Sequence, residues 1–188
     1  MIKIGITGSL ASGKTTASKI LSNKKRPLFS ADKVVRKLYR QNYFRNFVAK
    51  SLRFKLSKNF KKQLKDSIMQ KNAKLKKLEK IIHPLVRKEM FVFFKKNKSC
   101  KVIFFEIPLL VESKLLKFFD VVIFIKSAKS LRLKRYISRG GNIKLFSFLD
   151  HHQIKDTVKR RFCDHVVTNN KSLSILKKQL SNIIKLYE

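Results

Sequence analysis

Residues 8–15 constrain the fold of this chain more than any other segment. They read Gly-Ser-Leu-Ala-Ser-Gly-Lys-Thr and satisfy the pattern GxxxxGK[ST] at every fixed position. The alternating residues Ile2, Ile4 and Ile6 precede them as a short strand, and residues 15–21 have helical character. A glycine loop between a strand and a helix turns backbone amides and the positive helix end toward one point, which suits a phosphate group. The sequence therefore predicts a phosphate-binding loop in an α/β fold.

This phosphate loop (residues 8–15) predicts binding of ATP with Mg²⁺. Lys14 is expected to neutralise charge on the β- and γ-phosphates, and the Thr15 hydroxyl to coordinate Mg²⁺. The alternative is a glycine-containing turn with a solvent lysine, but the chain has only five glycines, which makes a chance match in this context improbable. The predicted nucleotide-binding residues of this region are Gly8, Ser9, Leu10, Ala11, Ser12, Gly13, Lys14, Thr15 and Thr16.

Further apolar runs predict the rest of a parallel sheet. Residues 101–106 and 120–125 are continuous apolar runs, typical of strands that helices cover on both faces. Short strands are expected at 27–29 and 165–168, and a closing amphipathic helix at 173–187. Because strands alternate with helices, we expect a five-stranded parallel sheet of the P-loop NTPase type, flanked by helices.

Two helical stretches interrupt this predicted core. Apolar residues at three- and four-residue steps predict helices from Asp32 to about Asn97. Later, a basic helix at about 128–138 and a second helical segment at 146–162 flank the breaker Gly140-Gly141. We expect one domain over 1–188, with a core of about 1–31, 99–127 and 162–188, a substrate-binding insertion of about 32–98 and a lid of about 128–161.

Charge and cysteine content narrow the classes of protein. Lys and Arg number 46 against 11 Asp and Glu, a formal net charge of +35. The lysines are spread along the whole chain among Phe, Ile, Leu and Asn, and the basic stretches 58–80 and 132–139 are interpreted as solvated helix faces, so we favour compositional drift over a nucleic-acid surface. Cys100 and Cys163 have neither disulfide nor zinc spacing. Without a signal-peptide pattern or an apolar run long enough to span a bilayer, the protein is expected to be cytoplasmic, with no membrane partner.

Three ordered motifs resemble those of a known family. Residues 29–36 read FSADKVVR, residues 78–87 read LEKIIHPLVR with an HPxxR pattern, and residues 106–112 read EIPLLVE with a PLLxE pattern. Together with Arg139 at a lid position, Gln153 in the lid helix and Asn169-Asn170 after the last strand, they resemble the dephospho-CoA kinase family. The resemblance runs from Met1 to about Asn170 and is more specific than the phosphate loop alone.

The resemblance implies ATP-dependent phosphorylation of the ribose 3′-hydroxyl of dephospho-CoA, the last step of coenzyme A synthesis. ATP and Mg²⁺ are the implied cofactors, ATP and dephospho-CoA the small-molecule partners, and a monomer or weak homo-oligomer the expected state. The implied catalytic residues are Asp32, Lys14 and Arg139. The implied acceptor-binding residues are Asp32, Arg36, His83, Arg87, Pro108 and Leu109. Asn170 is added to the nucleotide contacts, and Glu106, through a water, joins Thr15 as a Mg²⁺ residue.

Residue chemistry supports the role of Asp32 independently. An acceptor hydroxyl is a poor nucleophile, so a carboxylate within hydrogen-bond reach helps by orienting it and accepting its proton. The alternative for Asp32 is a helix N-cap. Arg36 and Arg87 suit phosphate groups, and Arg139 beside the glycine pair suits closure over ATP, although solvated surface arginines are the alternative for each.

The other candidates have structural alternatives as well. Glu106 is also explained as a strand-end carboxylate, and His83 as a residue that ends a helix before a proline. Pro108 and Leu109 are also explained as a strand-exit turn, and Asn169-Asn170 as a turn. The sequence departs from the family pattern at Ser30 and Gly140, where the family has aspartates, and this puts a secondary acidic contact and the details of the lid in doubt.

Two other functions remain open from the sequence. Another P-loop small-molecule kinase, acting on nucleosides or nucleoside monophosphates, shares the phosphate loop but needs a different acceptor lobe. A basic nucleic-acid-binding NTPase accounts for the charge, but the sequence has no RNP, KH or zinc-finger pattern. No dedicated nucleic-acid partner is therefore expected.

Overall fold

A five-stranded parallel sheet organises the computed structural model, which describes residues 1–187. The strands are β1 (Ile2–Thr7), β2 (Leu28–Ser30), β3 (Val102–Glu106), β4 (Val121–Lys126) and β5 (His165–Thr168). Their order is β2-β3-β1-β4-β5, and every neighbouring pair is parallel. The predicted sheet is confirmed, and β1, which leads into the phosphate loop, lies at its centre.

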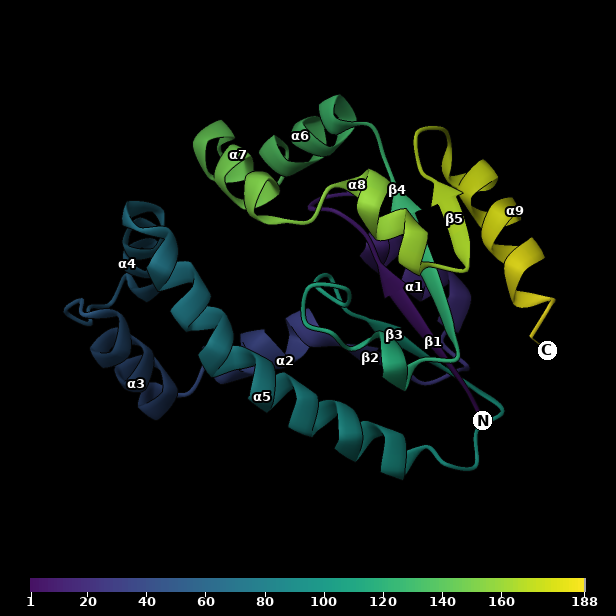
Figure 1. Cartoon of the computed structure of the whole chain (residues 1–188), viewed down its shortest axis with the longest axis horizontal. Helices are drawn as coiled ribbons and strands as arrows, with labels where there is room; N and C mark the ends of the chain where they lie inside the picture. The colour runs from purple at the N-terminus through teal and green to yellow at the C-terminus, as the bar shows by residue number, and fades with distance from the viewer. Residues whose placement is uncertain (188) are drawn as a thin grey trace. The chain divides into compact units, whose positions relative to one another are not determined.

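Helices α1 (Lys14–Ser22) and α9 (Leu173–Ile184) pack on the sheet (Figure 1). Apolar side chains of β1, β3 and β4 form one buried cluster with these two helices. Over β1, Gly5 lies so close to Leu110 and Phe119 that an added Cβ would be 2.7 Å from the Leu110 side chain. All five residues of β3 are buried, as expected for a strand that is covered on both faces. A 3₁₀ turn, η1 (Leu116–Phe118), lies between β3 and β4.

The chain divides into two compact units. One consists of Met1–Ser30 and the chain from Lys95 onward, and the other of Ala31–Phe94. The second unit is helical, with α2 (Ala31–Leu38), α3 (Asn42–Leu52), α4 (Phe60–Gln70) and most of α5 (Asn72–Lys96). Its core includes the rings of Tyr39 and Phe60, whose centroids are 5.5 Å apart. The apolar spacing of this stretch predicted helices, and helices are what it forms.

Pro84 lies inside α5, which continues to Lys96. The interpretation of His83 as a residue that ends a helix is therefore wrong. A proline removes one backbone donor and disfavours the helical conformation of the residue before it. Apolar residues on both sides of Pro84 are buried in the core of this unit, and we attribute the continuity of the helix to their packing.

The lid segment (residues 128–161) contains α6 (Lys129–Ile137), α7 (Ile143–His152) and α8 (Asp156–Lys159), and the turn η2 (Arg160–Phe162) follows α8. The helical segment expected over about 146–162 begins earlier, at Ile143, and is divided, because the chain is not helical at residues 153–155. Gly140 has a left-handed φ of 81°, which fits the predicted break between two helices. Asn142 caps α7 by accepting a hydrogen bond from the Leu145 N–H at 2.8 Å.

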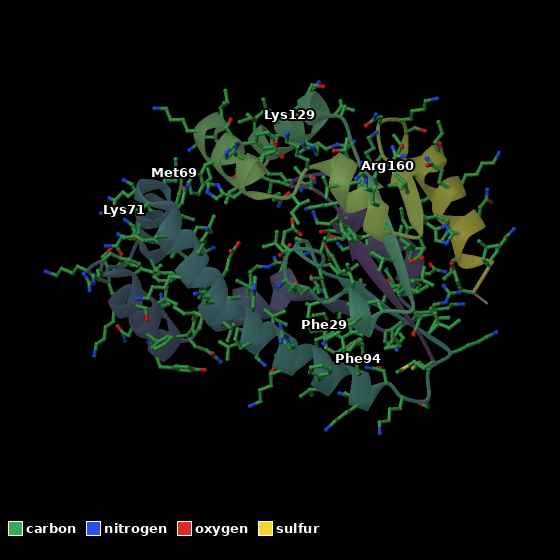
Figure 2. The ribbon with its side chains drawn as sticks, in the orientation of Figure 1. Phe29, Met69, Lys71, Phe94, Lys129 and Arg160 are labelled. Atoms are coloured by element: carbon green, nitrogen blue, oxygen red, sulfur yellow. The ribbon has the colours of Figure 1, made fainter. Side chains whose placement is uncertain are left out.

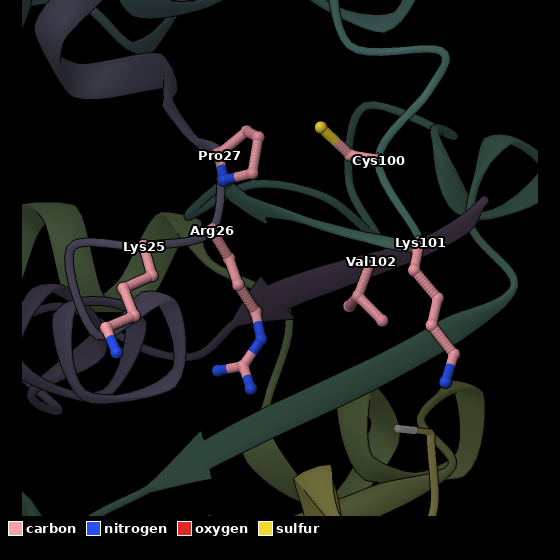
Figure 3. A pocket seen from close by; sticks show the side chains of 6 residues that line it. All are labelled: Lys25, Arg26, Pro27, Cys100, Lys101 and Val102. Atoms are coloured by element: carbon pink, nitrogen blue, oxygen red, sulfur yellow. The ribbon is translucent and has the colours of Figure 1, made fainter.

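A pocket of about 490 Å³ lies at the end of the sheet opposite the phosphate loop (Figure 3). It lies at the amino-terminal ends of β2 and β3, whereas the phosphate loop follows the carboxyl end of β1. The Cys100 sulfur points toward Pro27, and the Lys25, Arg26 and Lys101 side chains extend away from it. The cationic groups therefore do not converge on one anion.

Cationic side chains project from both units, as Lys71, Lys129 and Arg160 illustrate in Figure 2. This spread agrees with lysines distributed along the whole sequence. Among residues 1–187, none of the helices combines the length and apolar character needed to cross a bilayer.

Candidate nucleotide and phosphoryl-transfer site

Two close approaches of backbone and side chains fix the phosphate loop at the end of β1. A Cβ on Gly8 would lie 2.4 Å from the Ile125 carbonyl oxygen, and one on Gly13 would lie 2.2 Å from Asn169 Nδ2. Gly13 also has a φ of 100°, a conformation that side chains disfavour. Both glycines of the motif are thus required by neighbouring segments, β4 at Ile125 and the residue after β5 at Asn169, as well as by the turn itself.

Lys14 begins α1 and is buried, with 8% of its surface exposed. Its Nζ donates a hydrogen bond to the Ser9 carbonyl oxygen at 2.9 Å. The ammonium group is therefore held against the loop that contains it. Because α1 begins at this point, its free backbone amides and its positive end lie beside the same group.

Glu106 joins β3 to the phosphate loop. It is the last residue of β3, pairs in register with Ile6 of β1 and is only 2% exposed. The Thr15 hydroxyl donates a hydrogen bond to Glu106 Oε1, and the Ser18 hydroxyl donates one to Oε2 at 3.4 Å. The structure therefore brings together the two residues predicted to serve Mg²⁺.

The oxygen donors at this point fit Mg²⁺, which prefers hydroxyl, carboxylate, phosphate and water oxygens. Within the described part of the chain there is no cluster of three or more His, Cys, Asp or Glu that could hold a metal by itself. A site made of Thr15 and Glu106 consequently needs phosphate and water oxygens to complete it. Ser18 was missed by the sequence analysis, although it lies one helical turn after Thr15.

Two arginines of α6 contact carbonyl groups of the phosphate loop. Arg132, 6% exposed, donates to the Leu10 carbonyl at 3.4 Å and forms an ion pair with Asp150. Arg135 donates to the Asn169 carbonyl at 2.9 Å and to the Ser12 carbonyl at 3.5 Å. The interpretation of residues 132–139 as a solvated helix face is therefore wrong for Arg132.

Asn169 links the last strand to the phosphate loop. Its Nδ2 donates to the Ser12 carbonyl oxygen at 2.9 Å, and its own carbonyl accepts from the Ser127 hydroxyl at 3.1 Å. The neighbouring Asn170 instead accepts the Ala128 N–H at 2.8 Å. Both asparagines therefore have structural contacts, and the predicted nucleotide contact of Asn170 stays a prediction.

The break between α7 and α8 brings two further polar side chains to the loop. Gln153 Oε1 accepts the Leu10 N–H at 3.0 Å, and the Ser9 hydroxyl donates to the Asp156 carboxylate. Asp156 belongs to no motif, so nothing in the sequence marked it as part of the site. The lid segment is thus hydrogen-bonded to residues 9 and 10 of the phosphate loop.

A buried ion pair anchors this same segment to the chain that follows β3. Lys159 Nζ lies 2.6 Å from Glu112 Oε1, and the Lys159 side chain is fully buried. Glu112, the acidic residue of the PLLxE pattern, also accepts the Ile154 N–H at 3.2 Å.

Nearby, burial and the Asp164 carboxylate raise the pKa of the Cys163 thiol to about 11, against a smaller lowering effect of Lys159.

Arg139 follows α6 and its side chain is exposed. Its backbone N–H donates to the Tyr136 carbonyl at 3.3 Å. Tyr136 packs against Gly141 and Phe146, and partial burial raises the pKa of its hydroxyl. The predicted closure of Arg139 over ATP stays a prediction.

Pro108 and Leu109 form part of the turn after β3. The Pro108 carbonyl accepts the Thr7 hydroxyl at 3.0 Å, and the Leu109 carbonyl accepts the Ser113 hydroxyl at 2.6 Å. The structural alternative, a strand-exit turn, is confirmed for both residues. Contact with an acceptor stays a prediction for them.

The remaining predicted residues belong to the helical unit. Asp32 lies in the first turn of α2, which begins at Ala31, so its interpretation as the N-cap is wrong. It is exposed, and Arg36 Nε donates to its main-chain carbonyl at 3.4 Å. Asp32 follows by two residues Ser30 of β2, which pairs in register with Glu106. On α5, His83 is half-buried and Arg87 exposed.

Comparisons with known proteins agree on one family. The dephospho-CoA kinase family model matches residues 2–174. Dephospho-CoA kinase of Rickettsia conorii is 32% identical over 98% of this chain and 97% of that protein, and that of Fusobacterium nucleatum is 34% identical over 94% of each. The solved dephospho-CoA kinase of Campylobacter jejuni is 26% identical, with a TM-score of 0.64 over 97% of this chain and 95% of that one.

A more distant solved structure shares the fold alone. Shikimate kinase from Acinetobacter baumannii, in complex with shikimate, is 15% identical and has a TM-score of 0.54 over 99% of this chain and 92% of that one. The fold by itself therefore does not specify which small molecule such a protein binds.

Proposed function

Because this chain belongs to the dephospho-CoA kinase family, we propose that it transfers the γ-phosphoryl group of ATP to the ribose 3′-hydroxyl of dephospho-CoA. The observation that carries the proposal is the hydrogen bond from Thr15 of the phosphate loop to buried Glu106 at the end of β3. This hydrogen bond places a hydroxyl and a carboxylate, both of which can serve the Mg²⁺ of a Mg-nucleotide, side by side. The family supplies the choice of dephospho-CoA as the acceptor.

Thr15 and Glu106 hold Mg²⁺ in this proposal, Thr15 directly and Glu106 through a water. The ion neutralises phosphate charge when it is bound. Ser18, which donates to the second carboxylate oxygen, keeps Glu106 facing the loop. To hold the ion, Thr15 would present its hydroxyl oxygen and keep its proton, and its hydrogen bond to Glu106 would be given up.

Lys14 binds the β- and γ-phosphates. Its Nζ already lies on the loop, where it donates to the Ser9 carbonyl. Exchange of this neutral acceptor for anionic phosphate oxygens gives stronger, charge-assisted hydrogen bonds. Arg139 adds positive charge as the lid segment closes, and Asn170 contributes to the nucleotide site.

Asp32 is the proposed base. Its carboxylate orients the ribose hydroxyl and accepts the proton as the phosphoryl group transfers. Arg36 and Arg87 bind the diphosphate of the acceptor, because guanidinium groups pair with phosphate oxygens. His83, Pro108 and Leu109 are proposed to shape the rest of the acceptor site.

We assign these tasks to parts of one domain: a core of about 1–31, 99–127 and 162–188, an acceptor-binding insertion of about 32–98 and the lid segment. Binding of two small molecules requires neither nucleic acid nor membrane. The proposed compartment is the cytoplasm and the proposed state a monomer or weak homo-oligomer.

The test is conversion of dephospho-CoA to CoA by purified protein with Mg-ATP. Asp32→Asn should lower kcat by about two to four orders of magnitude, since general-base catalysis contributes that much, and leave the Kd for ATP within about threefold. Asp66→Asn, an exposed aspartate on α4, is the matched control. Nucleosides, nucleoside monophosphates and shikimate serve as competing acceptors, and preference for any of them would refute the proposed substrate.

A further inference from the structure

Ala11 lies within the phosphate loop and has a left-handed φ of 59°. Residues with a Cβ disfavour this conformation, so it persists only where the surroundings hold it. Inside the loop, the Ser12 N–H donates to the Ser9 carbonyl at 3.1 Å and fixes the peptide that follows Ala11. The peptide that precedes Ala11 is fixed from outside, where Arg132 Nη1 donates to the Leu10 carbonyl at 3.4 Å. The conformation of the loop therefore depends on a side chain of the lid segment.

The contact with the Leu10 carbonyl also sets the direction of the Ala11 amide. The peptide bond between these two residues is planar and trans, so its C=O and its N–H point in opposite directions. Because the carbonyl faces Arg132, the Ala11 N–H points away from Arg132. Backbone amides around a left-handed residue form a concave site for anions. The Ala11 amide is therefore suited to a phosphate oxygen, and Arg132 can set its direction without contacting the nucleotide.

Arg132 is itself held on several sides. Its Nη1 forms the ion pair with Asp150, its Nε donates to the Ser127 carbonyl at 3.2 Å, and its Cζ lies 5.7 Å from the centre of the Phe146 ring. The guanidinium is buried, and the Asp150 carboxylate balances its charge. A group whose own position is locked by its neighbours holds a carbonyl more precisely than an exposed side chain does.

Resting on nucleotide binding as given under the proposed function, we propose that Arg132 is a positioning residue of the phosphate loop. It holds the Leu10 carbonyl so that the Ala11 amide donates to a phosphate of the nucleotide, and Asp150 holds Arg132 in turn. ADP is the probe, because it carries the β-phosphate that such a loop binds. Its dissociation constant is measured by calorimetric titration, with no acceptor present.

Arg132→Met should raise the Kd for ADP about tenfold, because a charge-assisted hydrogen bond weakens steeply when its donor is misaligned. Lys129→Met is the matched control and should leave the Kd within about twofold. Lys129 pairs with the same carboxylate at 3.6 Å but is 70% exposed, and both variants lose one positive charge. Arg132→Lys should stay within about threefold of the wild type, because the contacts with Leu10 and Asp150 both use Nη1, which one ammonium group can replace.

The double variant Arg132→Met with Asp150→Leu separates positioning from stability, because it removes the buried pair without changing the net charge. Urea denaturation should show it to be more stable than Arg132→Met alone, whereas its Kd for ADP should stay raised about tenfold. A Kd that returns to the wild-type value in the double variant, or that does not rise in Arg132→Met, would overturn the proposal.

A measurement on the wild type covers the case in which the variants do not fold. Addition of ADP should shift the Ala11 amide proton downfield in the NMR spectrum, as expected for a new hydrogen bond to phosphate. An unshifted resonance in the ADP complex would overturn the proposal. Failure of the wild type to phosphorylate dephospho-CoA would instead refute the proposed acceptor, since neither the titration nor the spectrum contains one.

Discussion

The hydroxyl of Thr15 donates a hydrogen bond to the carboxylate of Glu106, 91 residues away in the sequence. The first residue belongs to the phosphate loop and the second ends the neighbouring strand β3. If Mg²⁺ replaces this hydrogen bond, the strength of its binding depends on the charge of Glu106.

Glu106→Gln should therefore raise the Mg²⁺ concentration for half-maximal activity and lower kcat/KM by about 10- to 100-fold, the range for outer-shell groups of metal sites. A Mg²⁺ titration of the initial rate at saturating ATP measures it. Glu89→Gln, at an exposed position of α5, should leave the titration unchanged. Identical titrations of Glu106→Gln and wild type would remove Glu106 from the metal site.

Gly13→Ala should lower the free energy of unfolding by about 1–3 kcal/mol and abolish ATP binding, because its Cβ would lie 2.2 Å from Asn169 Nδ2. Gly140→Ala is the control that separates the cost of this clash from the cost of backbone strain. Gly140 also has a positive φ, 81°, but nothing lies within 4 Å of its added Cβ, so its cost should stay near 1 kcal/mol. Urea denaturation measures the free energy of unfolding of both variants, and titration measures their affinity for ATP. Equal losses of stability in the two variants would show that Asn169 moves away from the new Cβ and that the clash costs nothing.

Lys159→Met should destabilise the protein by about 3–5 kcal/mol, because it leaves the Glu112 carboxylate without its buried partner. Replacing both residues, by Lys159→Met with Glu112→Leu, should recover at least half of the loss. Lys155→Met, at an exposed position just before α8, is the control and should cost under about 0.5 kcal/mol. If the single variant is as stable as this control, the ion pair does not anchor the lid segment.

Tyr39 should make the stability of the protein depend on pH in the alkaline range. Burial raises the pKa of its hydroxyl from 10.0 to about 12. Since the folded pKa exceeds the unfolded one, the contribution of the neutral phenol is complete below pH 10 and is lost as the pH rises toward 12. After allowance for partial exposure, the loss is about 1–2 kcal/mol. Urea denaturation of wild type and Tyr39→Phe between pH 9 and 12 measures it as the fall in the stability of the wild type relative to that of Tyr39→Phe. A constant gap would contradict the shift.

Much of the fold could be predicted because local patterns are strong where both faces of a strand are buried. The run at 101–106 contains β3, the run at 120–125 covers β4 except for its last residue, Lys126, and the phosphate loop lies where its motif requires. The helix break at 153–155 could not be predicted, because no glycine or proline marks it. It coincides with the contacts of Gln153 and Asp156 to the phosphate loop, which are tertiary interactions.

Residues of the candidate site were predicted only where they occupy fixed positions of a motif. Thr15 and Glu106 were predicted and meet in the structure. Arg132 was not, since nothing local distinguishes it from the other basic residues of its helix, and its burial depends on Leu10 and Asp150. In a chain with 46 lysines and arginines, sequence alone does not identify those that are buried.

The order of the strands has a consequence for biosynthesis. β1 is made first but pairs only with β3 and β4, which begin at residues 102 and 121. Its isoleucines therefore stay without strand partners until β3 and β4 have been made. Asn169 donates a hydrogen bond to the Ser12 carbonyl, so the phosphate loop receives this support only after β5 has been made. We therefore expect ATP to protect the released chain from proteolysis. It should protect ribosome-bound chains that stop before β5 much less.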